Sequence, residues 1–532
     1  MTKKGPRPWL AWLALCALIC VLRLPSLLSE HVIDDEGMYT AVAVELAHGG
    51  LPYVDAVERK PPLLLWTYAG VLRVLGDYNL RGLHGVAALW LLASMYLLYR
   101  VARRLWDEAA GLSAALLYGI FVPWATYTNL AWNGEMLMNL PTIGALLLIL
   151  PERRAVPPVR LFAAGALIAT AALFKQPAAI SIVPLAIYPW FPSASREDGA
   201  TGVPAKRGPR QVAQSLIASC WVLGGFLGTL SAMALLLWRL GILREAFYWS
   251  VLDHDVPHGP LSLVFWERAL PRAFWFVAAS APLLWGSYRA AAHSGKYFAG
   301  LRAQHLALCC LLFVSGIGTA ASGRFYPHYF IQMLPALCLL CAPVAAEIWH
   351  ARTRPEGRRR WRVSAFYITG TALVFFGLHA LAWSRTLQGG ALTKYLQQHC
   401  APNDRMFVWG QMPAYYAESR CRPASRYVAT FPLTGYIFGS PLNEDPSFDT
   451  SNRIVRGSWE TLERELTQRP PKFIVDVDGS APAPRYPIGN YALLRRLLEE
   501  AYECVKRTPD GVIYRRIAAD KSAQKQRAHG PA

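Results

Sequence analysis

Apolar and polar stretches alternate along most of the chain. Between residues 9 and 383, long apolar stretches recur and are separated by short polar loops. A helix of about 20 apolar residues crosses the hydrocarbon layer of a membrane. The pattern therefore predicts an α-helical polytopic membrane protein with about eleven transmembrane helices, at residues 9–28, 80–99, 109–125, 136–150, 161–174, 178–190, 212–238, 273–285, 305–320, 330–349 and 363–383.

The first apolar stretch, Trp9–Leu28, follows a short basic segment, so a cleaved signal peptide is an alternative. An uncleaved span is favoured, because the stretch is long for a signal peptide and no Ala-x-Ala site precedes Glu30. Arg23 lies near the far end of this stretch, where its long side chain is expected to reach the membrane surface.

Lys and Arg gather in every second loop, most strongly in residues 352–362, and the loops between them carry the acids. Loops rich in Lys and Arg stay on the cytoplasmic side of a membrane. We therefore expect a multi-pass protein of the bacterial cytoplasmic membrane. Its N-terminus is expected in the cytoplasm, and the acidic loops and the C-terminal tail outside.

Two shorter helices are expected between the first two spans. Residues 37–48 carry apolar side chains over one helical face, which predicts an amphipathic helix lying on the membrane. Residues 63–75 are apolar but too short to cross the bilayer comfortably, so they are expected to form an interfacial or half-buried helix.

The polar tail after residue 384 has a pattern of its own. Short strands are expected at 405–410, 426–430, 472–477 and 511–515, with helices at 459–468 and 491–501. This alternation of strands and helices predicts a small α/β domain. The expected organisation is a transmembrane module over residues 1–385, an extracytoplasmic α/β domain over 386–519 and a disordered tail over 520–532.

Composition agrees with a membrane protein. Of the 532 residues 54% are hydrophobic and only 17% are charged, whereas soluble domains have about a quarter charged residues. The formal net charge of +19 falls in short clusters, without a basic helix or an aromatic–basic sheet pattern, which argues against nucleic-acid binding.

Seven of the ten cysteines lie in apolar stretches and are expected to be buried as small hydrophobic residues. No CxxC pair has ligand spacing, so a structural zinc site is not supported. Cys400 and Cys421 are candidates for a disulfide if the tail lies outside the cytoplasm.

Three consecutive carboxylates, Asp34, Asp35 and Glu36, follow the first span. A carboxylate near hydrocarbon is costly to desolvate unless it is paired, metal-bound or faces water. Lys60 follows about 25 residues later, before two prolines, and is expected at the same membrane depth. This combination suits an anionic lipid-phosphate donor and a hydroxyl that must lose a proton; the alternative is an acidic loop that is merely solvated.

Asp34, Asp35 and Glu36 form the candidate catalytic group, with Asp34 or Asp35 as the predicted base for a hydroxyl acceptor. Glu36 is instead expected to accept backbone N–H bonds at the start of the following helix, where negative charge is favoured.

Other loops on the same predicted side add further candidates. Lys175 and Arg324 lie at the outer ends of two spans. For either residue alone, the alternative to a functional role is that its long side chain merely extends to the membrane surface. Together with Lys60 they provide the cations that a phosphate-linked lipid headgroup needs. The remaining polar residues of these loops include Glu135, His254, His258, His328 and Tyr329.

The loop Asp253-His254-Asp255-x-x-His258 leaves a divalent metal open as a cofactor, although its spacing is loose for a metal site.

These motifs resemble the GT-C glycosyltransferases. The resemblance rests on Asp35-Glu36, Lys60-Pro61-Pro62-Leu63-Leu64, Asn133-Gly134-Glu135, Lys175-Gln176-Pro177 and Gly323-Arg324-x-x-x-His328-Tyr329. It is strongest for the branch that contains protein O-mannosyltransferases and the lipid A aminoarabinose transferase. It covers about residues 9–385, and the tail looks like the extracytoplasmic α/β domain of many bacterial members.

The resemblance implies a polyprenyl-phosphate-sugar donor and an inverting transfer outside the cytoplasmic membrane, as in lipopolysaccharide modification or other cell-envelope glycan synthesis. By matching position, it makes Asp35 the catalytic acid-pair residue, and Lys60 and Arg324 ligands of the donor phosphate. Lys175 and Arg59 complete the expected donor-phosphate set. The residues assigned to the acceptor or to support are Glu135, His328, Tyr329 and His258.

One position departs from the family pattern. The aminoarabinose transferases have Glu immediately before Lys-Pro-Pro, a position linked there to metal and phosphate binding. Here that residue is Arg59, with Glu58 one position further back. Aminoarabinose specificity is therefore not implied, and the candidate metal ligands are Glu58, His254 and His258.

The sequence thus predicts a membrane glycosyltransferase, hexosyl or pentosyl, that uses a polyprenyl-phosphate-linked sugar and a hydroxyl on a lipid, glycan or protein acceptor. A transporter or flippase of lipid-linked sugars is the first alternative, and it would favour inverted repeats, of which the sequence has none. The second alternative, a non-catalytic membrane scaffold, would not require Lys60 and Arg324 on the same side.

Overall fold

The structure is a computed structural model that describes residues 8–124, 126–152, 156–192, 207–253, 260–386, 390–401, 403–436, 449–480 and 486–517. The chain forms two compact units. The helical unit comprises Met1–Leu28, His84–Leu240 and His258–Trp383, and the mixed unit comprises Ser29–Leu83, Gly241–Pro257 and Ser384–Ala532. The acidic loop and the Lys-Pro-Pro segment therefore belong to the same compact unit as the C-terminal tail.

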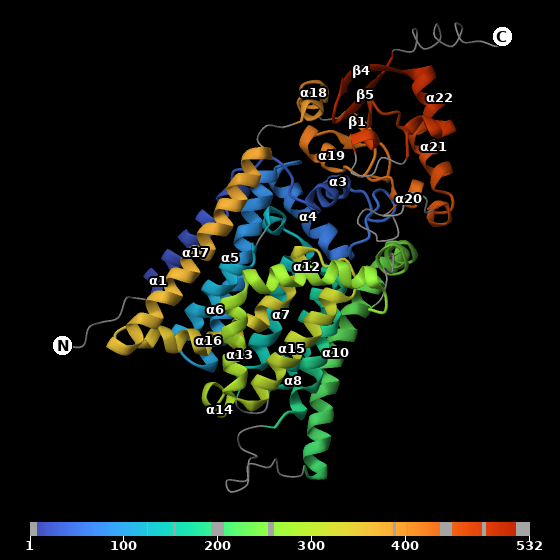
Figure 1. Ribbon diagram of the computed structural model, residues 1–532. Coiled ribbons are helices and arrows are strands. Elements are labelled where there is room, and N and C mark those ends of the chain that lie inside the picture. Colours follow the sequence, from blue (N-terminus) through green and yellow to red (C-terminus); the bar gives the residue numbers. More distant parts are fainter. Residues whose placement is uncertain are drawn as a thin grey trace, which may run out of the picture. The chain divides into compact units, whose positions relative to one another are not determined.

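The helical unit consists of α-helices and short 3-10 helices (Figure 1). Its elements are α1 (Pro8–Leu22), α2 (Leu24–Leu27), α5 (Leu80–Leu105, which begins in the mixed unit), α6 (Glu108–Phe121), η1 (Tyr127–Leu130), α7 (Gly134–Ile149), α8 (Pro158–Phe174), η2 (Gln176–Ser181), α9 (Ile182–Ile187), η3 (Tyr188–Trp190), α10 (Pro209–Arg239), α12 (Leu263–Ala279), α13 (Ala281–Ala292), α14 (Ser294–Tyr297), α15 (Arg302–Ala320), η6 (Pro327–Met333), α16 (Leu334–Ala351) and α17 (Pro355–Thr386).

Among the described residues, five helices are long and apolar enough to cross a membrane: Leu80–Leu105, Pro209–Arg239, Arg302–Ala320, Pro327–Ala351 and Pro355–Thr386. Five shorter apolar helices accompany them, at Trp9–Leu22, Pro62–Leu75, Glu108–Phe121, Gly134–Ile149 and Pro158–Phe174. The helical membrane character of the fold is confirmed. The number of eleven spans and their orientation stay predictions.

Two predicted spans take a different form. The stretch 178–190 is built from η2, α9 and η3 in succession, and the stretch 273–285 is divided between α12 and α13 at Ser280. Prolines occur in both stretches, at Pro184, Pro189 and Pro282, and a proline lacks the backbone donor that a helix needs. The average hydrophobicity of a stretch, from which the spans are predicted, does not reveal such breaks in a helix.

Helices α8 and α10 pack backbone against backbone. A Cβ atom added at Gly165 would lie 1.9 Å from the Val222 carbonyl oxygen, and one added at Gly225 would lie 1.9 Å from the Phe162 carbonyl oxygen. Only glycine allows this approach, which is a common way for helices to associate within a membrane. The outward face of α10 is apolar and exposed, as expected of a surface that contacts lipid, at Leu216, Ile217, Trp221, Leu227 and Trp238.

Arg23 departs from the sequence-based expectation. Its side chain is fully buried, and its Nη2 donates a hydrogen bond to the carbonyl oxygen of Leu130 at 2.5 Å. The expectation that it reaches the membrane surface is therefore wrong, because the chain of η1 provides an acceptor inside the bundle. The expectation of buried cysteines holds for Cys338 and Cys341 but not for Cys20 and Cys220, which are exposed on helix surfaces.

The mixed unit contains a five-stranded sheet and the helices around it. Its elements are α3 (Glu36–Ala47), α4 (Pro62–Leu75), α11 (Leu243–Phe247), the π-helical turn η5 (Tyr248–Leu252), α18 (Ala391–His399), β1 (Arg405–Trp409), α19 (Ala414–Ser419), β2 (Arg422–Pro423), α20 (Phe431–Thr434), η8 (Ser451–Arg453), α21 (Ser458–Gln468), β3 (Phe473–Asp476), η9 (Asp478–Ser480), η10 (Ile488–Asn490), α22 (Ala492–Ala501), β4 (Tyr502–Thr508) and β5 (Gly511–Arg516).

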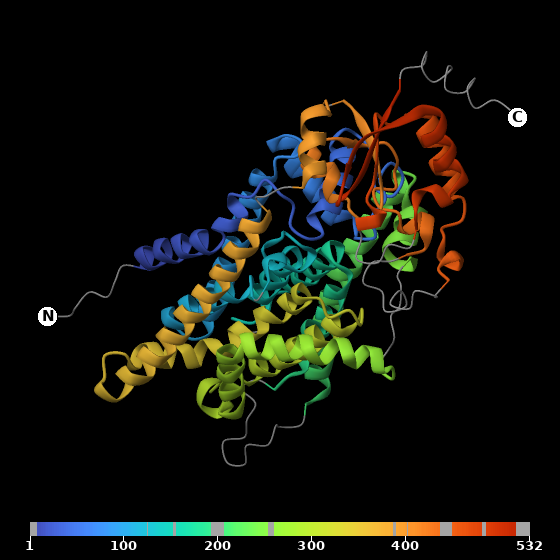
Figure 2. The ribbon, with the colours of Figure 1, turned by 45° about the horizontal axis from the view of Figure 1, so that its top comes forward.

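The strand order is β2-β1-β3-β5-β4. Strands β1, β2 and β3 are parallel, whereas β5 runs antiparallel to both β3 and β4. Helix α18 packs on one face of the sheet, where Tyr395 meets Phe473 at 6.4 Å between ring centroids, and α22 covers the other face (Figure 2). The predicted α/β character of the tail is therefore present in the structure.

Three of the four expected strands are found, as β1, β3 and β5. The expected strand at 426–430 is wrong. The carbonyl oxygen of Arg426 accepts a hydrogen bond from the N–H of Val57, and the N–H of Arg426 donates to the Glu465 carboxylate. The backbone of this segment therefore pairs with no strand. The edge strand β4 was not expected, because polar residues on both of its faces hide the alternation.

The tail also carries a disulfide between Cys400 and Cys421, which confirms that pairing.

Helix α3 is buried almost all round, so the expectation of an amphipathic helix on a membrane surface is wrong. Ten of its twelve residues are buried, including both of its glutamates. At Gly37 an added Cβ atom would lie 3.0 Å from the backbone of Ala414 in α19. The covering residues come from α4 and, far along the chain, from the tail, and the sequence of α3 does not reveal the tail residues.

Candidate active site

The acidic loop folds back on itself before α3 begins. Asp34 adopts a left-handed backbone conformation with φ of 56°, which Asp tolerates better than most residues. The fully buried Glu36 accepts a hydrogen bond from the N–H of Ile33 to its Oε2 at 2.9 Å. This confirms that Glu36 serves the backbone, and it fixes the loop that carries Asp35.

Asp35 is oriented by its neighbours and remains accessible. The Tyr39 hydroxyl donates a hydrogen bond to Asp35 Oδ2 at 2.9 Å, and Lys60 Nζ lies 3.6 Å from the same oxygen. The side chain of Asp35 is 41% exposed. An oriented, solvent-accessible carboxylate is suited to accept a proton from a hydroxyl.

Lys60 lies between two carboxylates. Its Nζ is 3.6 Å from Asp35 Oδ2 and 3.7 Å from Glu58 Oε1, and the lysine side chain is 24% exposed. Its backbone carbonyl accepts a hydrogen bond from the buried Tyr53 hydroxyl at 2.8 Å. Burial and the nearby Glu58 raise the pKa of Tyr53 well above its ordinary value, so the phenol stays a donor.

The departure at Arg59 has a structural explanation. The Arg59 guanidinium lies over the ring of Phe431, 4.5 Å from its centroid, whereas the buried Glu58 faces Lys60. The carboxylate next to the lysine is therefore supplied one position earlier than in the family pattern.

The helical unit holds a second lysine–carboxylate group. Lys175 Nζ donates to Glu135 Oε1, and the ammonium lies 4.5 Å from the centroid of the Tyr329 ring. The side chains of Lys175 and Glu135 are only 10% and 1% exposed. Asn133 caps α7 by accepting the N–H of Met136 at 3.2 Å, which places Glu135 in the first helical turn.

Arg324 and His328 lie on the same segment of the helical unit. Arg324 is half-buried between Gly323 and Phe325, two residues with positive φ of 62° and 50°. His328 is buried and packs against the ring of Tyr329 at 4.8 Å between ring centroids. The strained turn fixes the direction in which the arginine leaves the backbone.

The structure thus brings together Asp35, Glu58 and Lys60 in the mixed unit. In the helical unit it brings together Glu135, Lys175 and Tyr329, with His328 beside Tyr329. That all of these residues serve one site stays a prediction. His254 and His258 lie outside the described residues.

The described residues contain no group of three or more His, Cys, Asp or Glu side chains that could hold a metal ion. Within the described ranges, the metal role suggested for Glu58 is therefore not supported by a set of three such side chains.

Sequence reasoning missed two tyrosines of the mixed-unit site. Tyr39 follows Asp35 by four residues, and side chains at that spacing meet on one side of a helix, so this contact had a local signal. Tyr53 reaches the carbonyl of Lys60 across a turn, and nothing in the sequence marks it.

Residues 59–197 match the family described as dolichyl-phosphate-mannose-protein mannosyltransferase. No curated protein was found to match the chain.

Among solved structures, ArnT from Cupriavidus metallidurans bound to undecaprenyl phosphate is similar with a TM-score of 0.61 and 16% identity, over 96% of this chain and 98% of that chain. ArnT in the apo state is similar with a TM-score of 0.62 and 15% identity, over the same shares. An oligosaccharyltransferase from Archaeoglobus fulgidus is more distant, with a TM-score of 0.49 and 14% identity, over 95% of this chain and 73% of that chain.

The matched segment begins at Arg59, between Glu58 and Lys60, and ends after the predicted span that follows Lys175. The likeness to ArnT extends over nearly the whole chain. These two findings confirm the resemblance that the motifs indicated: the chain has the fold of the GT-C glycosyltransferase superfamily.

Proposed function

We propose that this protein is a membrane glycosyltransferase that moves a sugar from a polyprenyl-phosphate donor to a hydroxyl acceptor. The observation that carries the proposal is the group formed by Asp35, Lys60 and Glu58, an accessible carboxylate beside a lysine, in a chain with the GT-C fold. The solved ArnT structure with undecaprenyl phosphate supports a lipid-phosphate donor for this fold.

The proposed reaction is a single displacement. The acceptor oxygen forms a bond to the anomeric carbon of the sugar while the bond from that carbon to the phosphate oxygen breaks with its electron pair. The acceptor proton passes to the Asp35 carboxylate, and polyprenyl phosphate leaves. Attack opposite the leaving group inverts the anomeric configuration.

Lys60 is proposed to stabilise the charge that develops on the departing phosphate. Its two carboxylate contacts are 3.6 and 3.7 Å long, so a phosphate oxygen can compete for its N–H donors. Asp34 is the alternative base, and Arg324 is proposed as a further phosphate ligand from its place in the sequence pattern.

We place the reaction outside the cytoplasmic membrane, with the N-terminus in the cytoplasm. The support is the alternation of basic and acidic loops along the sequence. The proposed acceptor is a hydroxyl group on a lipid, a glycan or a protein.

The test is transfer of radiolabelled sugar from a panel of polyprenyl-phosphate sugars by the purified protein in lipid, with membrane extract as the acceptor pool. We expect wild type to label an acceptor from one donor and Asp35→Asn to lose that transfer while keeping its fold. Transfer by Asp35→Asn at the wild-type rate would remove Asp35 as the base. Movement of the donor across sealed vesicles without any transfer would identify a transporter instead.

A further inference from the structure

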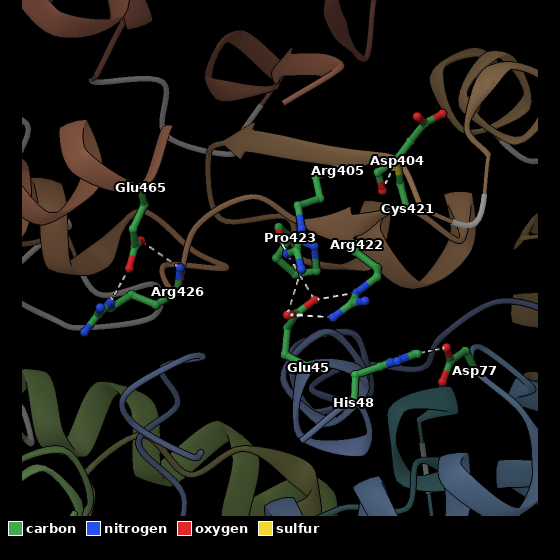
Figure 3. Close-up of polar contacts among 10 residues, drawn as sticks. All are labelled: Glu45, His48, Asp77, Asp404, Arg405, Cys421, Arg422, Pro423, Arg426 and Glu465. Atoms are coloured by element: carbon green, nitrogen blue, oxygen red, sulfur yellow. Dashed lines mark hydrogen bonds and ion pairs between the residues drawn. The ribbon is translucent and has the colours of Figure 1, made fainter. Parts of the chain in front are cut away.

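A buried carboxylate joins the far end of α3 to the sheet. Arg422 Nε donates to Glu45 Oε1 at 2.8 Å, and Arg422 Nη2 donates to Glu45 Oε2 at 3.0 Å. Arg405 approaches the same two oxygens, with Nη1 3.3 Å from Oε1 and Nη2 3.4 Å from Oε2. Figure 3 shows Glu45 on α3 directed at both guanidinium groups. The two arginines belong to β2 and β1, where they are paired residues of neighbouring strands. We call these three residues the Glu45 clamp.

The position of Glu45 is unfavourable without this clamp. It lies in the last turn of α3, where the helix dipole disfavours a negative charge, and its side chain is only 8% exposed. Two guanidinium groups supply the missing positive charge, and the hydrogen bonds that Arg422 donates to Glu45 raise the pKa of Arg422 above its ordinary value. Burying a carboxylate costs desolvation energy even when it is paired. Its presence here indicates that the clamp serves to fix the orientation of α3.

The same part of the sheet domain also touches the beginning of α3. Gly37 fits against the backbone of Ala414 in α19, and His31, just before the acidic loop, lies 3.3 Å from Glu418 at the other end of α19. Glu418 raises the pKa of His31, which favours its charged form. Residues 405–422 therefore hold α3 at both ends, and the Cys400–Cys421 disulfide secures the residue next to Arg422.

Helix α3 connects the clamp to the proposed base. Asp35 is its N-terminal flanking residue and Glu45 lies in its last turn, so a twelve-residue helix of about 18 Å transmits any rotation of one end to the other. We propose that Glu45, Arg405 and Arg422 are positioning residues for Asp35, so that the C-terminal α/β domain sets the orientation of the catalytic carboxylate. This inference rests on the function proposed above for Asp35.

The backbone around Lys60 is held by hydrogen bonds that do not involve α3. The carbonyl of Lys60 is held by Tyr53, and the N–H of Val57 bonds to the carbonyl of Arg426 at 2.9 Å, outside α3. Loss of the clamp should therefore displace Asp35 more than Lys60. The chemical step should slow while binding of the donor phosphate is largely preserved, a pattern that a general loss of stability would not produce.

The experiment compares Glu45→Gln, Glu45→Arg, Arg422→Lys and the exchange Glu45→Arg/Arg422→Glu in lipid, with kcat and donor KM measured per folded molecule. The exchange keeps one carboxylate between two guanidinium groups, because the carboxylate introduced on β2 would face both the guanidinium introduced on α3 and the native Arg405. The matched control is Glu463→Gln, which breaks the exposed pair of Glu463 and Arg496 at 2.7 Å in the same unit.

We expect Glu45→Gln to lower kcat about 10-fold and Glu45→Arg about 100-fold, with donor KM changed less than about 3-fold, since displacements near 1 Å cost rates of this order. Arg422→Lys should lie between wild type and Glu45→Gln. The exchange should recover at least about 10-fold of the loss seen in Glu45→Arg. Glu463→Gln should match wild type in both constants.

Hydrogen exchange over residues 36–47 provides a readout independent of activity. It should quicken in Glu45→Gln and return toward wild type in the exchange variant. Wild-type kcat in Glu45→Gln, or equal losses in kcat and in donor affinity, would overturn the positioning role. If Asp35→Asn is as active as wild type, the proposed function fails first; if Asp35→Asn is inactive and Glu45→Gln is fully active, only the clamp inference fails.

Discussion

The lysine–carboxylate group of the mixed unit and that of the helical unit differ in burial and in contact distance. The difference indicates that one lysine binds a ligand and the other stabilises the fold. In the mixed unit, Lys60 is 24% exposed and divided between Asp35 and Glu58 at 3.6 and 3.7 Å. In the helical unit, Lys175 is 10% exposed and bonded directly to Glu135, which is 1% exposed. The first lysine has long contacts and access to solvent, whereas the second is bonded to one buried carboxylate and lies against the Tyr329 ring.

This difference predicts different energetic roles. The partly exposed Lys60–Asp35 pair contributes about 0–1 kcal/mol to stability, so exchange of Asp35 for a ligand phosphate as the partner of Lys60 costs little. Breaking a buried pair by removing one member leaves an uncompensated charge and costs about 3–5 kcal/mol. We therefore expect Lys60 to act on a substrate and Lys175 to act mainly on the fold.

The largest effect is expected at Asp35. Asp35→Asn removes the proton acceptor while it keeps the size and most hydrogen bonds of the side chain. A general base contributes about 10²–10⁴-fold, so kcat should fall by that factor with little change in donor KM. The measurement is steady-state transfer in lipid, with Glu30→Gln as the control because Glu30 pairs with Arg81 at an exposed site. An increase in donor KM without a fall in kcat would assign Asp35 to donor binding instead.

The next effect is expected at Lys175. Lys175→Met leaves Glu135 buried without its cation, so the free energy of unfolding in lipid should fall by about 3–5 kcal/mol. The double variant Glu135→Gln/Lys175→Met should recover part of this loss, because the buried charge is gone. Thermal unfolding of the purified protein measures both. A stable Lys175→Met that has lost donor binding would reverse the contrast between the two lysines.

A smaller effect is expected at Lys60. Lys60→Ala should raise donor KM about 10–100-fold, which corresponds to loss of one or two charge-assisted hydrogen bonds to phosphate. Its stability should fall less than that of Lys175→Met, because the contacts of Lys60 with Asp35 and Glu58 are 3.6 and 3.7 Å long and the lysine is partly exposed. Lys60→Arg should keep most of the donor affinity. Unchanged donor KM in Lys60→Ala would remove this residue from the phosphate site.

The smallest effect is expected at Glu58. Glu58→Gln removes one of the two carboxylates that compete for the Lys60 ammonium. Donor KM should therefore fall a few-fold, by about 2–5, since the lysine becomes more available to phosphate. A large increase in donor KM would show that Glu58 contributes to binding rather than competing with the donor.

The sequence predicted the features that depend on local signals. Long apolar stretches located α5, α10 and α17, and the acidic cluster with Lys-Pro-Pro located the group around Asp35 and Lys60. The family motifs predicted the fold that the ArnT likeness confirms.

Features that depend on distant partners were not predictable in the same way. Helix α4, close by in the chain, covers part of α3, but the rest of its burial comes from α19 and the paired arginines, more than 350 residues further along the chain. Lys175 was expected to bind phosphate, and its bond to Glu135, 40 residues away, has no local signal. The segment 426–430 has strand-like residues, but its backbone groups bond to Val57 and Glu465 rather than to a strand.

The most direct test of this account is equilibrium binding of polyprenyl phosphate to wild type, Lys60→Ala and Lys175→Met in lipid nanodiscs. We predict that Lys60→Ala weakens binding about 10–100-fold, whereas Lys175→Met, measured on its folded fraction, binds within about 3-fold of wild type. Wild-type binding by Lys60→Ala together with loss of binding in Lys175→Met would contradict the account. It would move the phosphate site to the helical unit.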